Sequence, residues 1–258
     1  MPREPRTMPF LFRFTARSLL VGALALPVAV RGQSADSGDG FLFGRPHITV
    51  SFRGGVAQPS ASSDVFAFSR QNLTLGRRDY LGGSYGLDLA LRVAERLDVQ
   101  VGVAFSSRTA GSEFRNWVDN NDKPIEQTTT FRRTPVTLGV KYYLTSPGRT
   151  LGRLAWIPSK IAPYVSAGGG VMSYDYRQSG DFVDFKTLDV FHSSLSSRAN
   201  AAMIYGAAGV DYTLTPRLSV LTEARYDASR AKMNKDFQGF NRIDLSGLAV
   251  TAGLNVRF

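Results

Sequence analysis

Alternation of apolar and polar residues is the dominant pattern of the chain from about residue 46 onwards. A period of two indicates a β-strand with one apolar face. Eight segments carry this pattern. They are His47–Gln58, Leu81–Ala94, Leu97–Ser107, Thr134–Thr145, Pro163–Tyr176, Ala201–Leu214, Leu218–Ala228 and Leu248–Phe258. Each reaches the roughly 9–11 residues that cross a bilayer at a tilt.

The connections between these segments alternate in length. Glu95-Arg96 and Thr215-Pro216-Arg217 are short turns. Long polar connections, which we expect to be irregular extracellular loops, cover about 59–80, 108–133, 177–200 and 229–247. Short turns on one side and long loops on the other predict an all-β fold, an eight-stranded antiparallel transmembrane β-barrel with an up-and-down meander.

One connection on the short-turn side is long. Residues 146–162 contain Pro147, Trp156 and Pro158. We expect a periplasmic extension here that lies against the membrane interface or the barrel rim. Trp156 suits an interfacial position, where Trp is enriched.

The first 32 residues differ from the rest. Arg13 and Arg17 precede an apolar run of about a dozen residues that ends at Ala29. This order is typical of a signal peptide over 1–32, whereas the run is short for a membrane anchor helix, the alternative interpretation. We therefore expect export by the Sec pathway, a flexible leader over 33–45 and a barrel over 46–258.

Composition and charge then narrow the classes of function. Removal of 1–32 takes away five Arg and one Glu, which lowers the net charge from +10 to +6. An exported chain of this charge gives little support to nucleic-acid binding. The chain has no Cys, which excludes disulfides and a lipid-modified Cys.

The inward face of the predicted barrel carries charge. Eight strands enclose a bore just wide enough for side chains, and buried charges are tolerated when they are paired. The inward charged residues are Arg53, Asp88, Arg92, Lys141, Asp211, Glu223 and Arg225. The inward glycines are Gly55, Gly86, Gly102, Gly139 and Gly209. We expect an ion-pair network that plugs the lumen, with glycines leaving room for the long side chains.

Aromatic residues stand near the ends of the outward faces. Tyr142, Tyr212, Tyr226 and Phe258 suit the girdles that flank the apolar band of a membrane barrel.

Three motifs resemble the outer membrane protein A-like β-barrel family. Residues 206–226, from Gly-Ala-Ala-Gly-Val-Asp-Tyr to Glu-Ala-Arg-Tyr, are similar to its penultimate hairpin, and Pro163-Tyr-Val-Ser-Ala-Gly-Gly-Gly-Val171 to a Gly-rich strand. Gly253-Leu-Asn-Val-Arg-Phe258 is similar to the C-terminal signal read by the barrel assembly machinery. The resemblance implies an outer membrane location in a Gram-negative-type bacterium.

Chemistry for catalysis is sparse. With two His and no Cys the sequence offers no metal cluster, and no cofactor motif is present. His192-Ser193-Ser194 is the one local match to a lipid A-modifying enzyme, and a simple loop His explains it better.

The long connections are rich in Arg and aromatic residues. The basic ones are Arg70, Arg77, Arg78, Arg108, Arg115, Arg132, Arg133, Arg198, Arg230, Lys232, Lys235 and Arg242. They are either lipopolysaccharide-phosphate contacts or solvated charge. The aromatic ones are Phe66, Phe68, Phe114, Trp117, Phe182, Phe185, Phe191, Phe237 and Phe240, which indicate packed loops or a binding surface.

These patterns favour a monomeric, non-enzymatic outer membrane barrel with a structural or surface-interaction role. Its expected partners are outer membrane lipids, lipopolysaccharide and the barrel assembly machinery. The alternatives are a porin-like barrel that transports small solutes or apolar molecules and, third, a lipid A-modifying enzyme.

Overall fold

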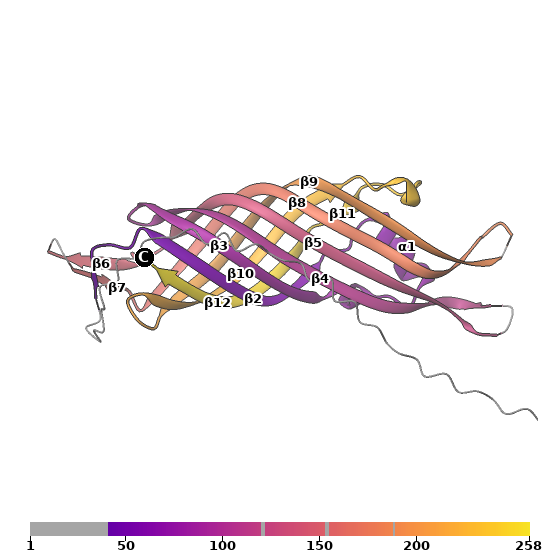
Figure 1. The fold of residues 1–258 in the computed structure, drawn as a ribbon, viewed down its shortest axis with the longest axis horizontal. Helices are drawn as coiled ribbons and strands as arrows, with labels where there is room; N and C mark the ends of the chain where they lie inside the picture. The colour runs from indigo at the N-terminus through magenta and orange to yellow at the C-terminus, as the bar shows by residue number, and fades with distance from the viewer. Residues whose placement is uncertain (1–40, 120–121, 153–154, 188) are drawn as a thin grey trace, which may run out of the picture. The chain divides into compact units, whose positions relative to one another are not determined.

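Eight antiparallel strands close on themselves to form a barrel (Figure 1). The computed structural model describes residues 41–119, 122–152, 155–187 and 189–258. The barrel strands are β2 (Ile48–Pro59), β3 (Gly82–Ala94), β4 (Leu97–Val118), β5 (Pro124–Tyr143), β8 (Ile161–Val183), β9 (Val190–Thr213), β10 (Leu218–Ala231) and β12 (Gly247–Arg257). β12 closes the ring against β2, where Val250 lies opposite Val56. The predicted eight-stranded antiparallel transmembrane β-barrel is confirmed.

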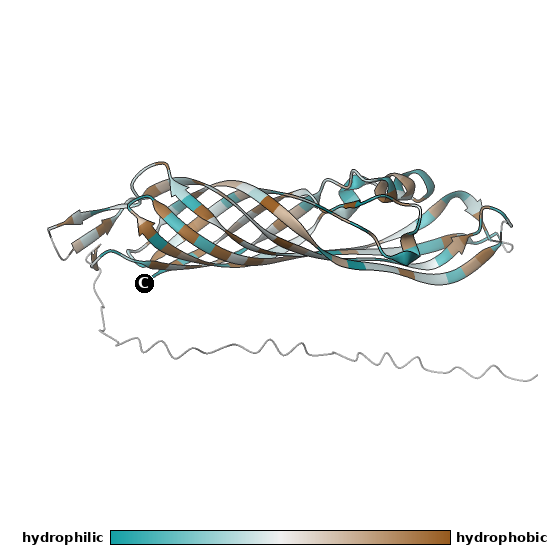
Figure 2. Ribbon diagram, turned by 90° about the horizontal axis from the view of Figure 1, so that it is seen from above, coloured by the Kyte–Doolittle hydropathy of each residue, from teal (hydrophilic) through white to brown (hydrophobic). Residues whose placement is uncertain are grey.

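Apolar side chains cover the outside of the barrel wall. On β5, Val136, Leu138, Val140 and Tyr142 are all exposed, whereas Lys141 between them is buried inside. Brown apolar and teal polar residues alternate along the strands in Figure 2. Because ring closure pairs the backbone groups of every strand, the wall can lie in lipid without unsatisfied backbone.

Four strands continue beyond the barrel as two long hairpins. β4 pairs with β5 as far as Val118 and Pro124, and β8 with β9 as far as Val183 and Val190. Figure 1 shows them running past the ends of the shorter strands. The prediction of irregular loops at 108–133 and 177–200 was wrong, since most of these residues are in strands.

The reason lies in a switch of the apolar face. Within the barrel, β5 turns Val136 outward and Lys141 inward; in the extension it turns Arg132 outward and Phe131 inward. The period of two persists, but the apolar residues change sides. A search for one continuous apolar face therefore ends each strand too early.

An apolar core fills the space inside these hairpins. It includes helix α1 (Asp64–Asn72), the 3-10 turns η1 (Arg77–Tyr80) and η2 (Lys235–Phe237), and the short strand β11 (Ile243–Asp244). Its buried members, here called the aromatic cap, are Ala61, Val65, Phe66, Leu73, Leu75, Tyr80, Phe114, Ile125, Phe131, Met172, Tyr174, Tyr176, Val183, Met203, Tyr205, Ala231, Phe237, Ile243 and Leu245. No helix in the described ranges is long and apolar enough to cross a membrane.

A small three-stranded sheet lies at the other end. It orders β1 (Leu42–Phe43), β7 (Ala155–Pro158) and β6 (Gly148–Leu151). Trp156 is 2% exposed and pairs with Leu42, so its predicted position at the lipid interface was wrong. Part of the leader expected to be flexible is thus a strand. The predicted signal peptide over 1–32 lies outside the described residues.

Candidate functional site

The middle of the lumen is organised by one arginine. Arg53 donates from Nε and Nη2 to Asp88, at 2.7 and 3.0 Å, and from Nη1 to Glu223 at 2.8 Å. Tyr164 donates its hydroxyl to the other oxygen of Glu223 at 3.1 Å. Four strands, β2, β3, β8 and β10, are thereby joined across the bore by charge-assisted hydrogen bonds, the strong class.

A second group lies towards the short-turn end. Lys141 Nζ is 3.0 Å from Asp211, which also accepts from the Tyr143 hydroxyl at 3.0 Å. The Lys141 ammonium stands 3.7 Å from the centre of the Tyr164 ring, a cation–π contact. Arg92 pairs with Asp98 from the neighbouring strand. The four side chains of the Lys141–Asp211 and Arg92–Asp98 ion pairs are each less than a tenth exposed, so they fill the bore at this level.

A third group lies towards the loop end. Arg225 Nε donates to Asp227 at 2.8 Å, and its guanidinium carbon stands 3.8 Å from the centre of the Tyr205 ring. Arg133 is 5% exposed and donates to the Leu245 carbonyl at 2.9 Å. The interpretation of Arg133 as a loop cation facing outward was wrong, because β5 extends through it and turns it inward.

All seven predicted lumen residues point inward, but they form separate groups. Arg53 joins Asp88 and Glu223, and Lys141 joins Asp211, whereas Arg92 and Arg225 take partners that the sequence interpretation left out. Those partners, Asp98 and Asp227, had a visible signal. Asp98 faces Arg92 across a short turn, and Asp227 lies two residues beyond Arg225 on the same face.

Two glycines make room for the central group. A Cβ on Gly86 would lie 2.8 Å from Arg53 Nε, and a Cβ on Gly102 would lie 2.1 Å from Asp88 Oδ1. Both distances are too short for any side chain. Gly86 and Gly102 are therefore part of the charged site, whereas a Cβ on Gly55 would meet the Val250 carbonyl of the wall instead.

The predicted girdle residues lie on the outside of the wall. Tyr142, Tyr212, Tyr226 and Phe258 are between 42% and 57% exposed. Tyr85 and Phe105, which sequence reasoning did not select, are exposed and directly opposite each other on β3 and β4. Whether these aromatics sit at membrane interfaces stays a prediction.

His192 lies on the outer surface of the β8–β9 extension, where it is the register partner of Asp181, and not beside the charged groups of the lumen. Its Nδ1 is 2.9 Å from Asp181 Oδ1, and its side chain is 77% exposed. No serine hydroxyl bonds to it among the interactions of the described residues. Within those residues no group of three or more His, Asp or Glu side chains is placed to hold a metal ion.

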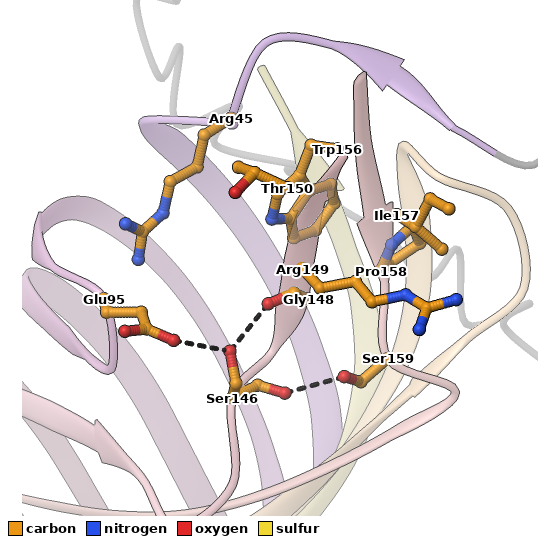
Figure 3. Close-up of a pocket in the computed structure, with 10 residues that line it drawn as sticks. All are labelled: Arg45, Glu95, Ser146, Gly148, Arg149, Thr150, Trp156, Ile157, Pro158 and Ser159. Atoms are coloured by element: carbon orange, nitrogen blue, oxygen red, sulfur yellow. Dashed lines mark hydrogen bonds between the residues drawn. The ribbon is translucent and has the colours of Figure 1, made fainter. Parts of the chain in front are cut away.

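An open cavity of about 740 Å³ lies where the small sheet meets the β3–β4 turn (Figure 3). Ser146 donates to Glu95 Oε1 at 3.0 Å, and Ser159 donates to the Ser146 carbonyl at 2.7 Å. Arg45, Trp156 and neighbouring polar groups complete the lining. These hydrogen bonds join the turn to the sheet, so we interpret the cavity as a structural gap between the two elements.

A closed antiparallel sheet with an apolar exterior and a charged, filled interior defines a transmembrane β-barrel protein. No protein-family model and no curated protein matches the chain. Among solved structures it is similar to Neisserial surface protein A (16% identity, 85% of this chain and 97% of the other, TM-score 0.45). It is also similar to the outer membrane protein OprG from Pseudomonas aeruginosa (17%, 84% and 99%, TM-score 0.48) and to Ail, the attachment invasion locus protein of Yersinia pestis (12%, 84% and 100%, TM-score 0.40). At these values nothing about ligand or activity follows, and the resemblance to the outer membrane protein A-like family stays a prediction.

Proposed function

We propose that this chain is a bacterial outer membrane barrel that holds its capped extension at the cell surface and passes no solute through its lumen. Its role is structural or a surface interaction, and it involves no catalytic step or cofactor. One observation carries the proposal: the bore is obstructed at three levels, by the ion pairs around Lys141, by those around Arg53 and by the aromatic cap.

The apolar wall and the pairing of β12 support the proposed location. An apolar belt on a closed barrel suits a bilayer, and the pattern of residues 1–32 is that expected of an export signal. Phe258 donates its amide to the Ile48 carbonyl at 2.8 Å, so the last residue takes part in ring closure. This agrees with a terminal strand that the barrel assembly machinery recognises.

The transport alternative requires a continuous aqueous path. The carboxylates that could line one are paired with lumen cations, and Arg133 and Arg257 donate to Leu245 and to Thr213 and Ser219. The aromatic cap covers these groups towards the long-loop side. The enzyme alternative rests on His192, which faces solvent beside one carboxylate. In the described residues, no structural observation favours either alternative.

Single-channel recording in planar bilayers tests the proposal. We expect the wild-type protein to insert without steady conductance. The triple variant Arg53→Ala, Lys141→Ala, Phe66→Ala shortens one side chain in the central group, one in the group around Lys141 and one in the aromatic cap, and should conduct. Steady nanosiemens-scale openings of the wild-type protein would overturn the closed-lumen function.

A further inference from the structure

Three arginines project from the outer face of the wall just above its apolar belt. Arg132 of β5, Asp175 of β8 and Arg198 of β9 are register partners in a row across three adjacent strands. Arg177 lies two residues beyond Asp175 and therefore on the same face. Three cations and one anion give this cluster a net charge of about +2 at neutral pH.

The outward residues change in order along these strands. Val136, Val171 and Ala202 form an apolar row. The next outward row is polar and uncharged, where Ser173 donates to Asn200 at 2.8 Å. The arginine row follows, four residues beyond the apolar row, which is about 13 Å along a strand and about 10 Å in height after a tilt of about 40°.

Asp175 positions two of the three arginines. It accepts from Arg177 Nε and Nη2 at 2.9 and 3.0 Å, and it lies 3.1 Å from Arg198 Nε. The Arg177 and Arg198 side chains are nevertheless 43% and 59% exposed, while Asp175 is 18% exposed. One sheltered carboxylate thus holds two guanidinium groups in place and leaves donors of each facing outward.

Arg132 is exposed and unneutralised. Among the interactions of the described residues it makes no hydrogen bond or ion pair, although Asp175 is its register partner. A guanidinium offers five donors in a planar fork that matches phosphate oxygens. Free donors from three strands therefore converge on an anion-binding surface.

We propose that Arg132, Arg177 and Arg198 bind the phosphate groups of a phosphorylated glycolipid in the leaflet around the extended end of the barrel. This inference rests on the proposed outer membrane location. The height of the cluster identifies the ligand as a membrane lipid, because Arg side chains can reach down from there to the headgroup region. A binding site for a soluble anion would not need to lie directly above the lipid-facing wall.

The test compares binding of lipid A that carries two phosphates with binding of the same lipid after enzymatic dephosphorylation, by native mass spectrometry of the refolded full-length chain in detergent. The wild-type protein should bind the phosphorylated form at least tenfold more tightly. The triple variant Arg132→Gln, Arg177→Gln, Arg198→Gln should lose this preference. The triple variant Arg132→Lys, Arg177→Lys, Arg198→Lys keeps the charge but loses the planar guanidinium groups. It should retain only part of the preference for the phosphorylated lipid.

Arg149→Gln is the matched control, since it removes an exposed arginine at the opposite end and should leave the preference unchanged. A triple Gln variant that still prefers the phosphorylated lipid overturns the inference. So does inorganic phosphate that competes as well as the lipid, which would indicate a soluble ligand. A wild-type protein that fails to insert into phosphatidylcholine vesicles, with no shift between heated and unheated forms on a detergent gel, refutes the proposed function instead.

Discussion

Arg53 and Asp88 lie diagonally on adjacent strands, and each stands opposite a glycine. Gly86 is the register partner of Arg53, and Gly102 is the register partner of Asp88. The two parallel hydrogen bonds between guanidinium and carboxylate, at 2.7 and 3.0 Å, occupy the space that these glycines leave. The central ion pair and the glycines thus form one steric unit.

Replacement of Arg53 tests the pair directly. Arg53→Met leaves the carboxylates of Asp88 and Glu223 buried without their cation, which should lower the free energy of unfolding by about 3–5 kcal/mol. Urea unfolding in lipid vesicles, followed by Trp fluorescence, measures the change. Arg149→Met, at an exposed site, should change it by less than about 0.5 kcal/mol. Equal stability of the two variants would contradict a central role for Arg53.

Gly102→Ala tests the steric half of the unit. The added Cβ would meet Asp88 Oδ1 at 2.1 Å and displace it, and overpacking of this kind costs about 1–3 kcal/mol. Gly206→Ala is the control, because no atom lies within 4 Å of the added Cβ. The same urea titration compares them, and a Gly102→Ala barrel as stable as Gly206→Ala would show that Asp88 can move freely.

The aromatic cap should unfold separately from the barrel. Phe66 is fully buried and contacts the rings of Tyr80, Phe131 and Tyr176 edge-to-face. Phe66→Ala should destabilise the cap by about 3–5 kcal/mol and expose residues 59–80 to hydrogen exchange and protease. The barrel should still migrate faster when unheated on a detergent gel. Phe43→Ala removes a ring that is 76% exposed and should leave exchange in 59–80 unchanged.

We expect the attachment of the first long loop to the last to depend on pH. Asp244 accepts from the Ser62 amide and hydroxyl and from the Ser246 amide. Burial acts to raise the pKa of Asp244, but these hydrogen bonds outweigh it and lower the pKa below its ordinary value of 3.8. A carboxyl group whose pKa is lower in the folded state stabilises the attachment at pH values above its ordinary pKa of 3.8. This stabilisation is lost as the pH falls through the pKa of the folded state.

Hydrogen exchange around residues 60–64 should therefore be slow at pH 6 and faster below about pH 4, after correction for intrinsic rates. Asp244→Asn should exchange fast at both pH values. An Asn variant with the wild-type pH dependence would assign the titration to another group.

Strand number and ring closure were predictable because alternation is strong wherever lipid meets the outer face, as in residues 248–258. The inward position of the charged residues was predictable from the alternation of faces along each strand alone. The pairings did not, since the sequence does not show that Arg225 bonds to Asp227 on its own strand while Glu223 reaches Arg53 on β2. Such choices depend on side-chain reach within a curved wall.

The extended hairpins and the cap were missed for a different reason. Ile125, Gln127, Thr129 and Phe131 alternate with exposed residues as regularly as any barrel strand, but their apolar members face the interior. Sequence inspection for lipid-facing strands reads such a stretch as polar loop. Only the pairing with β8, as far as Gln127 opposite Gly180, shows that the wall continues above the bilayer.

The outward residues of the final strand also determine what bilayer thickness the protein suits. From Leu248 to Phe258 the strand covers about 33 Å, or about 25 Å of vertical height after a tilt of about 40°. A typical hydrocarbon layer is about 30 Å thick. Insertion should accordingly be faster and the folded state more stable in short-chain lipids, because a thicker layer would have to compress around the barrel or bring the polar rows beside Thr134 and Ser173 into contact with acyl chains.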